Sequence, residues 1–201
     1  MMFRKIKFGQ CGRSALEMVG VLVIVAILTV GGIAGFSKAT PKQKMSRLAD
    51  QAAVIITNIR AAYSIKNNYD GLTTLAAIQM GAISADMVRV SPATGQKEAF
   101  NAFGGHIFLA PAADKNSVFI TLSGLPAAAC TFLASSDWGG QMGNGVVSIA
   151  TLVQAEEAPV SAQLQNNIGK AENNTLPLSA ARAAAGCGGS GQKSAVVIQY
   201  K

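Results

Sequence analysis

The chain has 201 residues, of which 50% are hydrophobic and 13% are charged, with 17 Lys and Arg against 10 Asp and Glu. This length fits a single core, and the sequence has no internal repeat and no long linker, which excludes a repeat protein or a string of domains. The formal net charge of +7 favours anionic partners such as nucleic acid, but only if the cations stay with the folded chain.

A basic stretch at the start of the chain is followed by an apolar one. Arg4, Lys5 and Lys7 carry the only charges before Gly12. From Met18 to Phe36 the chain is apolar and uncharged, a run that reaches roughly 28 Å as a helix, close to the thickness of a bilayer's hydrocarbon core. The sequence therefore predicts a membrane span with a cytoplasmic N-terminus and the remaining chain on the far side.

Two cleavage positions are compatible with this arrangement, and they have opposite consequences. A signal peptidase site, small-x-small, is present at Ser37–Ala39, and a cut there would release a soluble domain that begins at Thr40. A cut after Gly12 would remove only the basic leader and leave the span attached. Glu17 lies at the edge of that span, where a carboxylate is costly next to lipid and tends to face a positive partner.

The segment from Gly12 to Ile24 (GRSALEMVGVLVI) resembles the prepilin peptidase signature of type IV pilins. In that family the glycine ends the leader and the glutamate is the fifth residue of the mature chain. The resemblance implies a bitopic prepilin that prepilin peptidase cuts and that inner-membrane assembly machinery polymerises into an extracellular fibre. The chain departs from the pattern at Arg13, since the first mature residue is usually apolar and becomes N-methylated.

Cleavage after Gly12 would create a new α-ammonium group on Arg13. If neighbouring helices stack in a filament core, the Glu17 carboxylate of one subunit can pair with this ammonium of the next. A misregistered neighbour leaves a charge unpaired in an apolar interior, which typically costs several kcal/mol. We therefore expect Arg13 and Glu17 to set the register of assembly, the alternative being that Glu17 marks the membrane interface of a plain signal anchor.

Beyond the span the helical pattern becomes amphipathic. Apolar residues recur at alternating steps of three and four, at Met45, Leu48, Ala52, Ile55, Ile59 and Ala62. The pattern predicts one long helix over residues 13–68, with its second half docked on a globular domain. Gly31, Gly32, Gly35 and Pro41 predict a kink or local melting between the two halves, although glycine and proline are also common in membrane helices generally.

Residues 69–201 are expected to form a small α+β domain with an antiparallel sheet, which together with the helix gives a pilin-like fold. The predicted elements are a helix over Thr73–Met80 closed by Gly81, a hairpin of Ile107–Leu109 and Val118–Leu122, two further strands at Val146–Ile149 and Ala195–Tyr200, and a loop over Ala183–Gly191. The strand before Pro126 and the cysteine after it resemble the type IVb branch of the pilins.

Cysteine arithmetic supports both export and the cut after Gly12. Cys11 lies in the leader, so its removal leaves Cys130 and Cys187 as a pair. A bridge between them would close a loop that contributes roughly 4 kcal/mol in the chain-entropy model. In type IV pilins such a disulfide bounds the variable region exposed on the fibre. The alternative, two reduced and buried cysteines, suits a cytosolic protein.

The sequence offers no catalytic or metal-binding constellation, and we expect neither an enzyme nor a cofactor. His106 is the sole histidine and has no cluster of ligands around it in the sequence. Without the leader, 14 Lys and Arg remain against 10 Asp and Glu, a net charge of +4, and no aromatic residues alternate with the cations to form a platform for bases. The sequence therefore shows no specific nucleic-acid site.

Taken together, these features predict the structural subunit of a type IV pilus, a homo-oligomeric fibre for adhesion, aggregation or conjugative contact. Two alternatives remain open. A minor pilin or type II secretion pseudopilin shares the same leader and helix, and differs mainly in abundance. A signal-anchored binding domain outside the cytoplasm would form no polymer.

Overall fold

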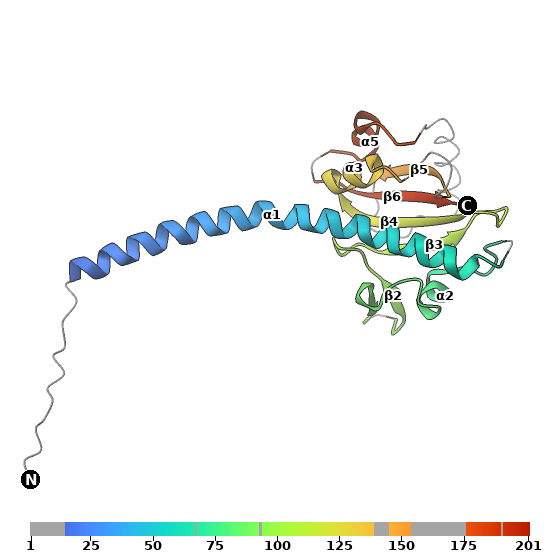
Figure 1. The fold of residues 1–201 in the computed structure, drawn as a ribbon, viewed down its shortest axis with the longest axis horizontal. Helices are drawn as coiled ribbons and strands as arrows, with labels where there is room; N and C mark the ends of the chain where they lie inside the picture. The colour runs from blue at the N-terminus through green and yellow to red at the C-terminus, as the bar shows by residue number, and fades with distance from the viewer. Residues whose placement is uncertain (1–14, 67, 93, 139–144, 154–175, 190) are drawn as a thin grey trace, which may run out of the picture. The chain divides into compact units, whose positions relative to one another are not determined.

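The computed structural model describes residues 15–66, 68–92, 94–138, 145–153, 176–189 and 191–201, without the side chains of residues 34–38. The chain divides into two compact units, one up to Lys42 and one from Gln43 to the C-terminus. Figure 1 shows the helix that begins in the first unit and the sheet domain of the second. The predicted cleavage residues Gly12 and Arg13 lie outside the described residues.

Helix α1 runs from Ala15 to Tyr63 and contains Pro41 in its interior. It therefore ends before residue 68, the predicted limit. Gly31, Gly32, Gly35 and Pro41 all lie within the helical segment, so the alternative of local melting at these residues is not seen. A kink there stays a prediction.

The second half of α1 supplies one wall of the core in the second unit. Leu48, Ala52, Ile55 and Ile59 are fully buried, which confirms most of the predicted stripe. The end of the stripe was predicted wrongly, because Ala62 is exposed and the neighbouring Tyr63 is buried instead. The larger tyrosine ring gains more from burial, and it packs against the ring of Tyr69 in a tilted arrangement with centroids 5.2 Å apart.

Four antiparallel strands form the main sheet in the order β3-β4-β6-β5. They are β3 (Ile107–Pro111), β4 (Val118–Pro126), β5 (Val146–Val153) and β6 (Lys193–Tyr200). Their order confirms the predicted hairpin, in which Leu109 pairs with Ile120, and places the C-terminal strand in the centre of the sheet. One face of β4, with Val118, Ile120 and Leu122, joins the core cluster that includes α1.

Smaller elements surround this sheet. They are α2 (Thr74–Gln79), a 3-10 turn (Ala85–Met87), a two-stranded sheet of β1 (Val88–Val90) and β2 (Lys97–Ala99), α3 (Ala127–Ser135) and α5 (Ala180–Gly186). Helix α2 confirms the prediction for Thr73–Met80, since Thr73 caps its N-terminus and Gly81 follows with a φ of +77°. The loop predicted for Ala183–Gly191 was partly wrong, because its first residues belong to α5.

Candidate functional site: the N-terminal helix and the disulfide-closed head

Glu17 lies in the first turn of α1, where the partial positive charge of the helix N-terminus favours a carboxylate. The residue is exposed, and the segment of α1 that follows it, as far as Ile33, has no other charged residue. Arg13, its predicted partner in a neighbouring subunit, lies outside the described residues. The structure therefore places one member of the predicted charge pair.

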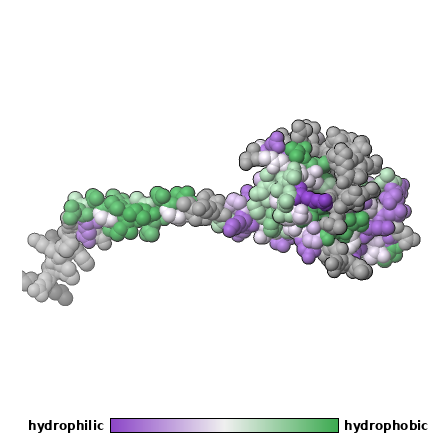
Figure 2. All heavy atoms as spheres, turned by 90° about the horizontal axis from the view of Figure 1, so that it is seen from above, coloured by the Kyte–Doolittle hydropathy of each residue, from purple (hydrophilic) through white to green (hydrophobic). Residues whose placement is uncertain are grey.

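The apolar half of α1 is long enough to cross a membrane. The segment from Ala15 to Ile33 has a mean hydropathy of 2.5 and buries none of its residues within the chain, a combination that a signal sequence can also show. Its large side chains, from Leu16 to Ile33, are each more than half exposed. Figure 2 shows this hydrophobic surface continuing along the N-terminal part of the helix. Such a surface requires lipid or other protein around it.

Small residues on this half of α1 leave room for a close neighbour. A Cβ atom built on Gly20, Gly31 or Gly32 would have no atom within 4 Å other than those of its chain neighbours and of the nearby backbone of its own helix. Apolar helices in lipid gain little from hydrophobic burial alone, so they associate through close packing at small residues and through polar pairs. These glycines and Glu17 supply both features on one helix.

Polar side chains of α1 fix its second half to the α+β domain of residues 69–201, which we call the head. The Gln51 side-chain oxygen accepts a hydrogen bond from the backbone N–H of Ala102 at 2.8 Å, and Asn58 donates one to the carbonyl of Ala82 at 3.1 Å. Gln51 is nearly buried, although the sequence pattern places it off the apolar stripe. Because the sequence pattern does not show that Gln51 is buried, it could not predict that this side chain bonds to the backbone of the head.

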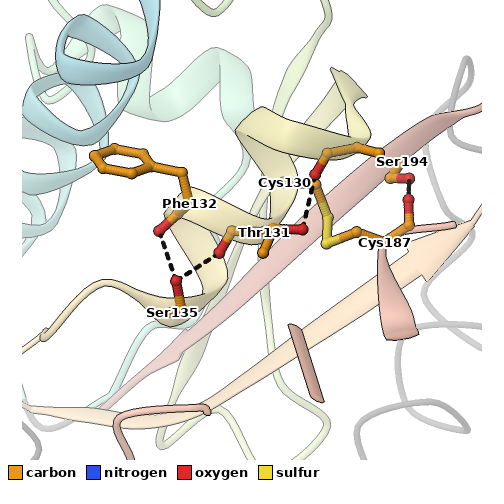
Figure 3. Close-up of a disulfide and its surroundings, with 7 residues drawn as sticks. Cys130, Thr131, Phe132, Ser135, Cys187 and Ser194 are labelled. Carbon is orange, nitrogen blue, oxygen red and sulfur yellow. Dashed lines mark hydrogen bonds between the residues drawn. A yellow bond between two sulfur atoms is a disulfide. The ribbon is translucent and has the colours of Figure 1, made fainter. Parts of the chain in front are cut away.

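A disulfide joins α3 to the residue that follows α5. Cys130 and Cys187 are bonded, with their Cα atoms 5.8 Å apart and both side chains fully buried, which confirms the predicted pair. Figure 3 shows the bridge between the two segments, with Ser194 of β6 donating a hydrogen bond to the Cys187 carbonyl. The disulfide thus ties the end of α5 to α3, and the hydrogen bond from Ser194 ties it to β6.

The segment after α1 is held to the β3–β4 turn by a short ion pair. Lys115 Nζ lies 2.8 Å from Asp70 Oδ1, and the backbone N–H of Tyr69 donates to the Lys115 carbonyl at 2.8 Å. The hydrogen bond from Lys115, and then its charge, lower the pKa of Asp70 below its ordinary value. Burial, and then the charge of Tyr200, raise the pKa of Tyr69.

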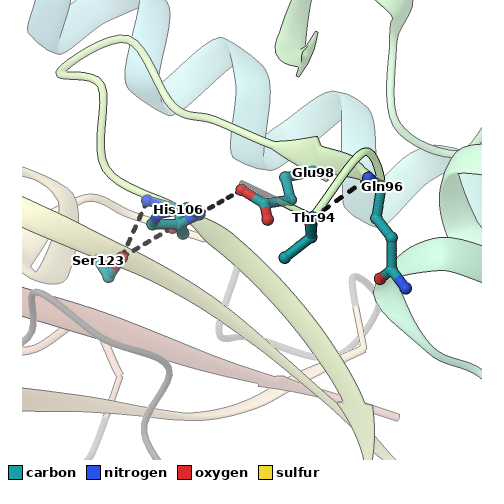
Figure 4. Close-up of polar contacts among 5 residues, drawn as sticks. All are labelled: Thr94, Gln96, Glu98, His106 and Ser123. Carbon is teal, nitrogen blue, oxygen red and sulfur yellow. Dashed lines mark hydrogen bonds and ion pairs between the residues drawn. The ribbon is translucent and has the colours of Figure 1, made fainter. Parts of the chain in front are cut away.

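His106 takes a structural place beside β3. Its ring lies 4.6 Å from that of Phe100 and 5.6 Å from that of Phe108, between centroids, and its Nδ1 atom is 3.8 Å from Glu98 Oε2. Figure 4 shows Glu98 directed toward the ring. Among the described residues, no group of three or more His, Cys, Asp or Glu side chains is placed to hold a metal ion.

Comparison with known proteins bears on the whole head and part of α1. The family model described as "PilS N terminal" matches residues 42–199. The fold is similar to a type IV b pilin from Salmonella typhi, with 21% identity, a TM-score of 0.47, and coverage of 74% of this chain and 96% of that one. It is also similar to TcpA, a type IV pilin from the Vibrio cholerae El Tor biotype, with 19% identity, a TM-score of 0.43, and coverage of 79% and 99%. No curated protein sequence matches the chain significantly.

The family match covers most of the chain, from the second half of α1 through the α+β domain that contains the disulfide. It confirms the pilin predicted from the sequence. The chain therefore belongs to the PilS N-terminal family and is a type IV pilin, a structural subunit of pili.

Proposed function

We propose that this pilin is the major subunit of a type IV pilus of the type IVb kind, cut after Gly12 and polymerised through α1 into a surface fibre. The observation that carries the proposal is the first part of α1, in which one carboxylate, Glu17, precedes a span whose side chains are exposed and whose glycines are open to close approach. A helix of this kind fits first a membrane and then a bundle of identical helices.

Before assembly, α1 would anchor the chain in the inner membrane. The cations at Arg4, Lys5 and Lys7 favour a cytoplasmic N-terminus, so the head would fold in the periplasm. The disulfide between Cys130 and Cys187 supports this location, because structural disulfides form in oxidising compartments. Prepilin peptidase and the inner-membrane assembly machinery are the partners that such a route requires.

In the fibre, Glu17 would pair with the new α-ammonium group of Arg13 in a neighbouring subunit. The pair would specify register more than it would add stability, because a buried ion pair gains little over apolar packing whereas an unpaired buried charge costs several kcal/mol. Close packing at Gly20, Gly31 and Gly32 would supply the attraction between helices.

Shearing experiments test this role against the two alternatives. Cells that express the chain with its assembly genes should shed fibres in which the chain is the most abundant protein, as measured by quantitative mass spectrometry and electron microscopy. A trace amount in the fibres would identify a minor pilin or pseudopilin instead. Recovery only as a soluble or cell-bound monomer would contradict polymerisation and favour an anchored binding domain. Adhesion and conjugative transfer can then be measured in a deletion strain.

A further inference from the structure

The outer edge of β1 is an open strand edge beside a cleft. In the β1–β2 pair, the N–H of Ser91 donates to the Gln96 carbonyl at 2.8 Å, and the N–H of Phe100 donates to the Met87 carbonyl at 2.7 Å. Because bonded and non-bonded pairs alternate along antiparallel strands, Arg89 also bonds toward β2, while the backbone groups of the residues on either side of it point away.

Val88 and Val90, on either side of Arg89, are the two residues of β1 whose backbone N–H and carbonyl groups point away from β2. The N–H of Val88 donates to the carbonyl of Ala85, but no described residue forms a hydrogen bond with the outward N–H or carbonyl of Val90. A cleft of about 450 Å³ borders all three residues of β1, and Ile78, Ile83 and Ser84 also line it. Val90 is 61% exposed there. Val90 thus combines backbone groups that have no partner among the described residues with an exposed apolar side chain beside the cleft.

Neighbouring helices contact both outer strands of the main sheet. On β3, the backbone N–H of Leu109 donates to Thr74 Oγ1 of α2 at 3.0 Å. Against β5 lies α5, so closely that a Cβ atom on Gly186 would be 1.9 Å from Thr151 Oγ1. An uncovered edge is a template for strand addition, which proteins normally block. At Val90 of β1, by contrast, no described residue forms such a hydrogen bond with the outward backbone groups.

The charges around the cleft favour an acidic partner. Arg89 and Lys97 line it and are exposed, and no carboxylate is among its described lining residues. Glu98 is the cross-strand partner of Arg89, but its carboxylate lies 3.8 Å from His106 (Figure 4), and the Asp86 carboxylate lies 2.9 Å from Arg47. The Arg89 guanidinium lies over the Phe100 ring, 5.2 Å from its centroid, and the residue stays exposed. A second copy of β1 fits poorly, because antiparallel pairing centred on Arg89 would place two arginines directly opposite each other.

We propose that β1 is the docking edge for an extended acidic segment of a partner protein, which adds a strand beside Val88–Val90. Main-chain hydrogen bonds to Val90 would hold the segment, as in other cases of strand addition. A carboxylate opposite Arg89, flanked by apolar residues opposite Val88 and Val90, would match the charge and the surface of the cleft. This docking edge lies in the head and does not depend on fibre assembly.

The test uses the full chain in detergent micelles and fluorescent peptides that carry Thr-Val-Glu-Val-Thr at their centre, or Thr-Val-Lys-Val-Thr as a control. Anisotropy should show saturable binding of the glutamate peptide, with the lysine peptide at least about tenfold weaker. Val90→Pro removes the outward N–H together with the valine side chain and should abolish binding, whereas Val90→Ala removes the side chain but keeps that N–H and should bind. Proline is tolerated at such an edge position, where its missing N–H is not needed by β2.

The Arg89→Glu variant gives an independent result, because it should reverse the preference in favour of the lysine peptide. Binding by a reversed variant requires a folded head, so this gain cannot come from misfolding. Absence of saturable binding to the wild-type chain would overturn the proposal. Equal binding by Val90→Pro and Val90→Ala, or an Arg89→Glu variant that still prefers the glutamate peptide, would overturn it as well.

Discussion

Glu17 shows how a single residue can carry information about assembly without adding stability. A carboxylate in the first turn of α1 is acceptable to the helix but costly to surround with lipid or with apolar side chains. That cost falls only when a cation meets it in one geometry, so the residue selects one arrangement of neighbours among many that would bury the same apolar area.

The substitution Glu17→Ala tests this role. Membrane insertion and cleavage after Gly12 should continue, because the apolar span and the leader are unchanged, whereas fibres should be absent from the sheared fraction. Asp50→Ala, which removes an exposed carboxylate farther along the same helix, is the control and should give normal fibres. Immunoblots of membrane and sheared fractions measure both steps. Normal piliation in Glu17→Ala would exclude the register hypothesis.

A second residue, Asp70, gives a prediction for pH dependence. Its pKa is lowered, first by the hydrogen bond from Lys115 and then by the charge of that lysine. A lowered pKa in the folded state means that the pair stabilises the head above the ordinary pKa of an aspartate. The contribution is lost as the pH falls through the folded-state value.

NMR titration of the Asp70 carboxyl group measures this shift directly. In the wild-type chain the group should titrate below 3.8, the ordinary value, and Lys115→Met should move the midpoint upward. Lys66→Met is the control, since the Lys66 ammonium lies 5.0 Å from the Tyr63 ring and takes no part in the pair. An Asp70 midpoint that stays in place in Lys115→Met would show that the ion pair does not cause the shift.

Among the elements, those with a long or strongly biased pattern could be predicted from the sequence. The stripe through Leu48, Ile55 and Ile59 located the buried face of α1, and the β-branched run before Tyr200 located β6. Strands β1 and β2 could not be predicted, because three residues carry too little periodicity and their pairing depends on contacts far apart in sequence.

Helix α5 was missed for a different reason. The density of glycines from Gly186 onward predicted a loop, but Ser179 accepts a hydrogen bond from the N–H of Arg182 and opens a short run rich in alanine, the best helix former. The capping residue was visible in the sequence. Its role as a cap could be recognised only once the helix after it was known, and that helix packs against α3 next to the disulfide.

The disulfide links these two helices, and its removal gives a prediction at this scale. Replacing both Cys130 and Cys187 by alanine should lower the free energy of unfolding by about 4 kcal/mol, because the unfolded chain regains the entropy of a long open loop. Denaturant unfolding in micelles measures the change. Cys11→Ala should leave stability unchanged, and an equal loss in that variant would indicate a different pairing.

For the molecule as a whole, the sequence predicted the order and type of the main parts better than the structural details within them. An apolar helix, an amphipathic continuation and an α+β head were all predictable, because each follows from composition and periodicity over many residues. The docking edge at β1 was not, since it depends on which backbone groups of Val90 remain unpaired after folding.

The most direct test of the central claim is mass spectrometry of the protein sheared from cells, measured intact and at its N-terminal peptide without reduction. A chain that begins at Arg13, with or without a methyl group, and that is lighter by the two hydrogens lost in the Cys130–Cys187 bond is the predicted result. A chain that begins at Thr40, or one that still begins at Met1, would contradict pilin processing and favour a secreted or anchored binding domain.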